Sequence, residues 1–336
     1  MDIFDNPFYV LGVGPRSSRE EIAAAADQAE LAGDPERAAA AAAALANPRR
    51  RLTAEVFFLP GMARKNADDL LDVVKGAARE VQEFQGAPPC AAVNLTAARL
   101  SRLDPKAGAE GTSDGIVLLS RAFEGADAAG VMRDIDADRR AAGMPPVRSI
   151  SDVEEDLNGL GRYCRQAVKE ALDRLPAGEL VEAVRRAAAS ETGGGTRPAP
   201  VIVRDMLEIY DVETMAFFSR EEATVQALLG ALKAVSAARG QPWKAAAVGE
   251  DLSKVLLNWK RVAAPLLIRW KGTGLMHKSS HRLALDVRAV TVEIHNSGGD
   301  PELARRMTRL LASVFGAVPE VNEVLDEDAK RLGTAL

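Results

Sequence analysis

The sequence contains little sulfur, little histidine and few aromatic side chains. Of its 336 residues, two are cysteine, three are histidine and 4% are aromatic. Cys90 and Cys164 lack the neighbouring cysteine or histidine of a zinc-binding or redox motif, so we expect two free, buried thiols in a reducing compartment. A Ser-His-Asp catalytic arrangement would need one of the three histidines, and no serine is marked as its partner.

Long apolar segments are also missing. No run reaches the roughly 18 apolar residues of a membrane-spanning helix, so we predict no membrane partner. Residues 1–5 are acidic and begin no signal-length apolar stretch, which favours a cytoplasmic location. The hydrophobic fraction of 47% excludes global disorder, and the net charge of −5 argues against wholesale binding of nucleic acid.

The loops that bind nucleotides and the motifs of common enzymes are absent as well. The three glycines at 193–195 are not followed by the Gly-Lys-Ser/Thr of a phosphate-binding loop, and Gly272-Thr273-Gly274 is too short for a dinucleotide loop. His277 and His281 are four residues apart and could share a zinc ion on one helix face, but surface or capping roles are the alternative that we favour. We therefore predict no enzyme, no metal and no cofactor.

Alanine is abundant, and it directs the prediction of the fold. The chain contains 60 alanines, and leucine, glutamate and arginine, which also favour helices, make up much of the rest. We predict an all-α protein with a small helical N-terminal unit followed by a multi-helix body. Its predicted parts are an N-terminal unit at 1–61, a helical domain at 62–191, a Gly- and Pro-rich linker at 192–200 and a C-terminal helical domain at 201–336.

Helix signals divide these parts further. Residues 283–294 fit either a strand or a helix face, and their length favours a helix. We predict a helix from residue 20 to about 31, a second at 36–46, and then helices at 65–86, 94–103, 113–123, 126–142, 151–174, 177–190, 201–218, 220–239, 249–270, 280–296, 300–315 and 319–332.

The first 61 residues resemble the J-domain of DnaJ-type co-chaperones. Residues 6–13 read Asn-Pro-Phe-Tyr-Val-Leu-Gly-Val, and residues 17–22 read Ser-Ser-Arg-Glu-Glu-Ile. A helix, a break and a second helix follow, and residues 47–52 read Asn-Pro-Arg-Arg-Arg-Leu. The resemblance implies a helical hairpin and a DnaK-type chaperone as the protein partner.

Two features on which J-domains depend are replaced in this chain. The resemblance implies a His-Pro-Asp loop that stimulates the partner's ATPase, but the loop here is Ala32-Gly33-Asp34-Pro35. The preceding helix should carry a basic face, yet residues 20–31 contain four acidic and no basic side chains. We therefore treat Gly33, Asp34 and Pro35 as a degenerate loop and expect no ordinary stimulation of the ATPase.

The rest of the chain resembles the C-terminal helical region of large bacterial J-domain proteins. The segments that carry this likeness are Asn258-Trp259, Pro265, the stretch from Gly274 to Leu283, and Val314 to Glu320. We interpret the protein as a non-enzymatic, atypical co-chaperone or adaptor.

Two basic segments are candidate partner-binding sites. The first segment is the stretch 254–288, which contains eight basic residues and a single acidic residue, Asp286. The stretch is therefore either an anion- or nucleic-acid-binding face, or a set of helix surfaces neutralised by acidic neighbours. The second segment is the arginine triplet at 49–51, for which a structural role is the alternative, since Arg51 and Glu55 are spaced to pair. The candidate residues are Arg49, Arg50, Arg51, Lys254, Lys260, Arg261, Arg269 and Lys271.

Overall fold

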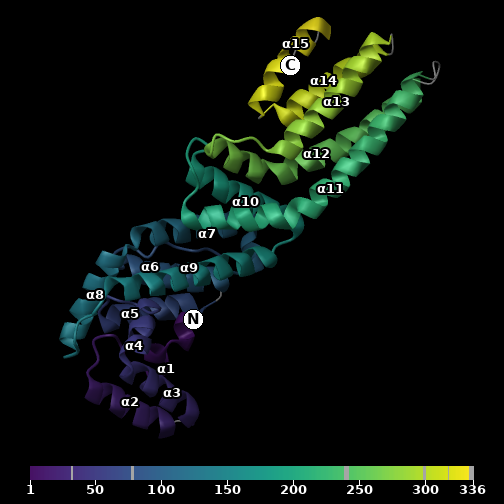
Figure 1. Cartoon of the computed structure of the whole chain (residues 1–336). Coiled ribbons are helices and arrows are strands. Elements are labelled where there is room, and N and C mark those ends of the chain that lie inside the picture. The colour runs from purple at the N-terminus through teal and green to yellow at the C-terminus, as the bar shows by residue number, and fades with distance from the viewer. Residues whose placement is uncertain (32, 77–78, 238–241, 298–299, 317, 333–336) are drawn as a thin grey trace. The chain divides into compact units, whose positions relative to one another are not determined.

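The computed structural model describes residues 1–31, 33–76, 79–237, 242–297, 300–316 and 318–332. Within these ranges the chain forms fifteen α-helices and two 3₁₀ helices, with no strand (Figure 1). The predicted all-α fold class is therefore confirmed. Among the described helices, none has both the length and the apolar character needed to span a bilayer.

The chain divides into two compact units. The first comprises Met1–Ala187 and Pro200–Met206, and the second comprises Ala188–Ala199 and Leu207–Leu336. Residues 1–61 and 62–187 therefore share one unit, and the finer division into domains stays a prediction. The first residues of the predicted linker form a hydrogen-bonded turn: the Gly194 N–H donates to the Ala189 carbonyl (2.9 Å) and the Thr196 N–H to the Thr192 carbonyl (2.9 Å).

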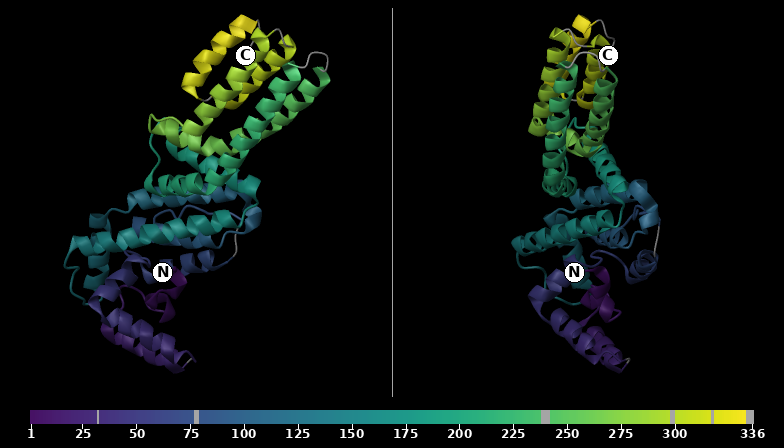
Figure 2. Two further views of the ribbon diagram at one scale, coloured as in Figure 1. Left: turned by 45° about the vertical axis from the view of Figure 1, so that its right-hand side comes forward. Right: turned by 90° about the vertical axis from the view of Figure 1, so that its right-hand side faces the viewer.

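The first unit is a layered set of helices. α2 packs against α3, α3 packs against α1 and α4, and α6 packs against α7 and α9. Figure 2 shows α2 and α3 side by side as a hairpin. The helices are η1 (Ile3–Asp5), α1 (Pro7–Val10), α2 (Arg19–Leu31), α3 (Pro35–Ala46), α4 (Pro48–Val56), α5 (Arg64–Lys75), α6 (Pro89–Ser101), η2 (Pro105–Ala107), α7 (Gly108–Gly125), α8 (Ala128–Ala141), α9 (Ile150–Asp173) and α10 (Ala177–Thr192), whose last residues belong to the second unit.

One apolar core joins the N-terminal helices to those that follow. Phe8 of α1 is fully buried and stacks on Phe58, with 5.6 Å between ring centroids. Leu71 of α5 and Leu95 of α6 belong to the same buried cluster. Because burial of one large apolar side chain contributes about 1.5–3 kcal/mol, these shared contacts stabilise the first 61 residues and the helices after them together.

The second unit is a bundle built around α14. It contains most of α11 (Val201–Ala237), with α12 (Pro242–Gly272), α13 (Lys278–Asn296), α14 (Pro301–Phe315) and α15 (Pro319–Leu332). α14 packs against α12, α13 and α15. Trp259 of α12 is 1% exposed, and its ring centroid lies 4.7 Å from that of Phe218 on α11.

Several predicted helix boundaries were wrong. The helix predicted at 65–86 ends at Lys75. Val81 and Phe84 lie beyond it in an irregular segment, and their side chains are buried. The helices predicted at 201–218 and 220–239 are one helix, α11, because no residue between them interrupts the backbone; residue 239 lies outside the described residues. The ambiguous residues 283–294 lie within α13, which confirms the helix prediction there.

Candidate protein-binding surfaces

Asn6 fixes α1 to the end of α4. Its side-chain oxygen accepts a hydrogen bond from the Phe8 N–H (3.0 Å), and its amide nitrogen donates to the carbonyls of Ala54 (2.8 Å) and Phe57 (3.0 Å). Asn6 is fully buried, so these bonds do not compete with water. The Asn-Pro-Phe-Tyr sequence thereby sets the position of α1 against the remaining helices.

Local capping signals define the α2–α3 hairpin. Ser18 and Glu21 form a capping box, in which the Glu21 N–H donates to Ser18 Oγ (3.2 Å) and the Ser18 N–H donates to Glu21 Oε2 (2.8 Å). Asp34 accepts from the Arg37 N–H (3.2 Å), and Pro35 begins α3. The buried side of the hairpin consists largely of alanines, among them Ala26, Ala38 and Ala41. Their small side chains allow close packing of the two helices.

The degenerate loop is a helix cap. Ala32 lies outside the described residues. Gly33 has a φ of 113°, a value that favours glycine. The carboxylate of Asp34 is engaged at the start of α3, and Leu31 beside the loop is 89% exposed.

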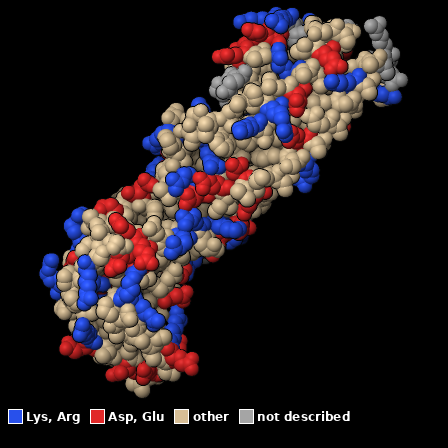
Figure 3. Space-filling model, viewed as in Figure 1, with Lys and Arg blue, Asp and Glu red and all other residues tan. Residues whose placement is uncertain are grey.

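The exposed side of α2 forms an acidic surface. We call this the acidic α2 surface; its members are Glu20, Glu21, Asp27 and Glu30, all exposed. From residue 19 to residue 37 the sequence contains six acidic and two basic residues. Figure 3 shows acidic atoms in the part of the view where Figure 1 labels α2 and α3. This charge is opposite to that implied by the J-domain resemblance.

A groove of about 390 Å³ lies between α1 and the α2–α3 hairpin. We call this the α1–α3 groove. Its apolar lining comes from Phe4, Tyr9, Val10, Ala29 and Ala38, and its polar lining comes from Asp5, Asp34 and Arg37. The Phe4 and Tyr9 rings meet edge to face at 4.9 Å between centroids, which gives the groove an aromatic wall.

Two of the three arginines at 49–51 have structural contacts, and Arg49 joins α4 to α9. Arg49 pairs with Asp156 and, at 3.1 Å, with Glu155, both on α9. The hydrogen bond to Asp156 and the charge of that carboxylate raise the pKa of Arg49. Arg51 is 2% exposed, Arg49 is half-buried, and Arg50 is the exposed member of the three.

Arg51 belongs to a buried charge network. Its Nε donates to Glu55 Oε1 (2.9 Å), and Arg139 of α8 contacts the same carboxylate, with Nη2 2.8 Å from Oε2. A second Arg51 nitrogen donates to the Pro15 carbonyl (3.1 Å), and its Nη1 has no partner among the described residues. The predicted pairing of Arg51 with Glu55 is therefore observed, and the pair is buried in the core.

Acidic residues on other turns and helices neutralise half of the basic 254–288 stretch. Lys254 pairs with Asp251 (2.9 Å), and Arg269 pairs with Asp211 (3.1 Å) and Glu208 (3.4 Å). Arg282 pairs with Glu222, and Arg288 pairs with Asp328 (2.5 Å). Figure 3 likewise shows blue and red atoms interspersed over the face in view.

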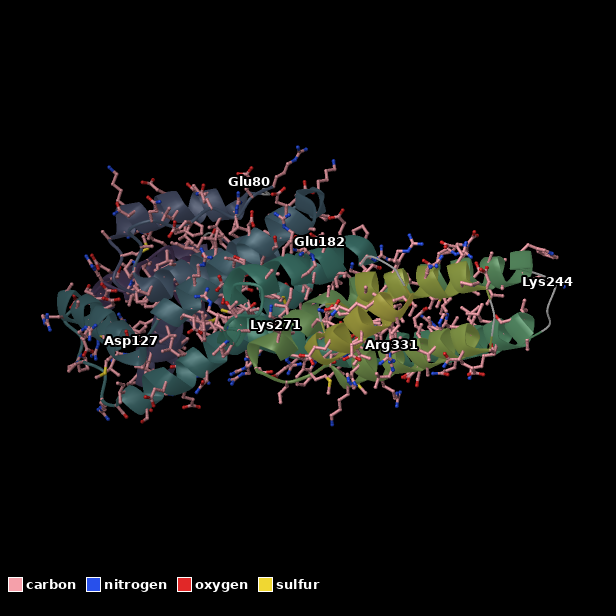
Figure 4. The ribbon with its side chains drawn as sticks, turned by 90° about the horizontal axis from the view of Figure 1, so that it is seen from above. Glu80, Asp127, Glu182, Lys244, Lys271 and Arg331 are labelled. Carbon is pink, nitrogen blue, oxygen red and sulfur yellow. The ribbon has the colours of Figure 1, made fainter. Side chains whose placement is uncertain are left out.

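The other four basic residues are exposed. They are Lys260, Arg261, Lys271 and Lys278. Arg261 bonds to Asn258 (2.9 Å), and Lys271, labelled in Figure 4, lies next to the last residue of α12. Within the described ranges these four residues form no ion pair with an acidic residue. Of the eight basic residues, they are therefore the ones whose charge is available to bind an anion.

His277 and both cysteines are part of the core packing, whereas His281 is half-buried and His295 is exposed. His277 precedes α13 and shares a hydrogen bond with Ser280 Oγ (2.7 Å), and burial lowers its pKa. No group of three potential ligands for a metal is present among the described residues. Both cysteines are fully buried; burial raises the pKa of Cys164 to about 12 and that of Cys90 further.

Comparison of the chain with protein-family models, with curated proteins and with solved structures finds no match.

Proposed function

We propose that this chain is a non-enzymatic adaptor whose first four helices form a J-like unit that binds a protein partner. The observation that carries the proposal is the order and packing of α1 to α4. A short helix follows Asn6, a hairpin turns at Asp34-Pro35, and a fourth helix begins after Asn47. In this arrangement α3 contacts both α1 and α4. The same order is implied by the resemblance of residues 6–13, 17–22 and 47–52 to J-domains.

The partner that the resemblance implies is a DnaK-type chaperone, bound without the usual ATPase trigger. Asp34 caps α3, and no histidine occurs before His277. The acidic α2 surface would also repel an acidic docking face, since complementary charge guides such docking. Contact with the chaperone therefore has to use another surface or another charge pattern.

Binding and ATPase assays with the full-length chain and a purified DnaK-type chaperone from the same organism test this proposal. We expect a stable complex and an unchanged rate of ATP hydrolysis. Charge reversal by Glu20→Lys with Asp27→Lys removes the repulsion from an acidic docking face and should raise the affinity, whereas Glu154→Lys on α9, also exposed, should leave it unchanged. Absence of a complex together with absence of any ATPase effect would overturn the proposal. Strong ATPase stimulation would overturn its second part.

Nucleic-acid binding by the 254–288 stretch is not the function we propose. Four of its eight basic residues already pair with carboxylates, so their charges contribute little to attracting a phosphate backbone.

A further inference from the structure

We propose that the α1–α3 groove binds a basic segment of another protein, and that one apolar side chain of that segment enters the groove. This inference rests on the proposed protein-binding function and adds the chemistry of the partner. The groove's volume, about 390 Å³, falls within the range of pockets that hold organic ligands, so it can accept one large side chain.

The lining explains the apolar part of this recognition. Tyr9 and Val10 belong to α1, Ala29 and Ala38 belong to the two arms of the hairpin, and Phe4 belongs to η1, so four helical elements form the walls. Tyr9, Val10 and Ala29 are only partly buried although they pack on the apolar core. A partner side chain would complete their removal from water, which favours binding.

The charges around the groove select a basic partner. Arg37 is engaged within the chain, because it donates to Asp5 (3.1 Å) and to the Phe4 carbonyl (3.3 Å). Asp34 is one of the lining residues. Glu30 is next to Ala29 in sequence, and Glu36 is next to Arg37. None of these three carboxylates forms an ion pair with a described basic side chain. Lys75, 5.9 Å from the centre of the Tyr9 ring, is the basic group that opposes them. The groove therefore lies beside a segment, residues 19–37, that has six acidic and two basic residues, and lysine or arginine of a partner would neutralise this excess of negative charge.

Fluorescence anisotropy with labelled twelve-residue peptides tests the proposal. The first peptide has lysines around a central phenylalanine, the second has serine in place of phenylalanine, and the third has glutamates in place of the lysines. We expect the Lys/Phe peptide to bind at least about tenfold more tightly than either of the others, as for a buried aromatic anchor. Equal binding of the Lys/Phe and Lys/Ser peptides would overturn the proposal.

Matched variants locate the binding site. Ala29→Phe fills the groove and should weaken binding of the Lys/Phe peptide at least about tenfold, whereas Ala43→Phe, on an exposed position of α3, should leave it within twofold. Glu30→Lys with Glu36→Lys should weaken binding similarly, with Glu154→Lys as its control. If Ala29→Phe proves unfolded by circular dichroism, the charge pair alone decides, and unchanged affinity in it overturns the proposal. Binding of the peptide without binding of a DnaK-type chaperone would support this inference and remove that chaperone as the partner.

Discussion

Glu55 on α4 and Arg139 on α8 form a buried ion pair, with 2.8 Å between Oε2 and Nη2. The two residues are 84 positions apart in sequence. Arg51 contacts the same carboxylate, so one buried negative charge is the counter-charge of two buried guanidinium groups.

Replacement of Glu55 should therefore be costly. Glu55→Gln leaves two buried arginines without a counter-charge, and we expect the free energy of unfolding to fall by about 3–5 kcal/mol. Glu36→Gln on the exposed start of α3 should change it by less than about 0.5 kcal/mol. Urea unfolding followed by circular dichroism measures both. A loss below about 1 kcal/mol for Glu55→Gln would show that this buried charge network does not stabilise the fold.

The glycines after α10 offer a matched pair. Gly194 and Gly195 have φ values of 69° and 86°. A Cβ at position 194 would meet no heavy atom within 4 Å, whereas one at 195 would lie 2.7 Å from the Ile268 carbonyl oxygen. We expect Gly194→Ala to cost about 1–2 kcal/mol for its backbone conformation, and Gly195→Ala to cost about 1–3 kcal/mol more. Thermal unfolding of the two variants gives the comparison, and equal losses would contradict it.

The second unit should lose stability as the solution becomes acidic. Burial holds the pKa of folded His277 below its ordinary value of 6.5. When the pH falls through 6.5, the unfolded chain binds a proton before the folded chain does, so His277 lowers the free energy of unfolding by up to about 1.4 kcal/mol per pH unit until its folded pKa is reached. Above pH 6.5 this effect is absent.

A comparison of unfolding curves at pH 7.5 and pH 5.5, followed by tryptophan fluorescence, measures this dependence. His277→Asn keeps an acceptor for Ser280 and should flatten the dependence. His295→Asn, at an exposed position, should preserve it. If the two variants behave alike, His277 is not the group responsible.

Arg269 and Lys260 should respond differently to loss of charge. Arg269 bridges Asp211 and Glu208, and its guanidinium lies 5.0 Å from the centre of the Trp270 ring. Arg269→Gln should therefore cost about 1–2 kcal/mol, because hydrogen bonds to charged groups are lost. Lys260→Gln, on an exposed position, should cost less than about 0.5 kcal/mol. Similar stabilities of these variants in denaturant titrations would contradict the assigned structural role.

Helix starts were predictable from sequence where the signal is local. Asp34-Pro35 and Asp300-Pro301 each place a capping side chain directly before a proline, and the helices predicted at 36–46 and 300–315 begin there. Starts without such a signal were wrong: α6, α7 and α12 begin at Pro89, Gly108 and Pro242, five to seven residues before the predicted positions. Helix ends and merged helices were harder. Gly76 ends α5 eleven residues after Lys65, whereas Ser219 lies inside one long helix.

The candidate sites show the same division between local and distant effects. The acidic side of α2 could be recognised from residues 20–31 alone. The pairing of Glu55 with Arg139 joins residues that are 84 positions apart, and the pairing of Arg49 with Asp156 joins residues that are 107 positions apart. No short sequence pattern predicts either contact. The α1–α3 groove was missed for this reason, since its walls come from four helical elements and no residue spacing predicts how these pack together.

The two fully buried cysteines have a practical consequence for spectroscopy. A thiol that is inaccessible and protonated does not react with maleimide reagents at neutral pH. We therefore expect neither native cysteine to react with such a reagent in the folded chain. A single cysteine placed at exposed Ala23 or Ala43 would be the one reactive thiol among the described residues. A dye at either position would report directly on the hairpin without any change to the native core.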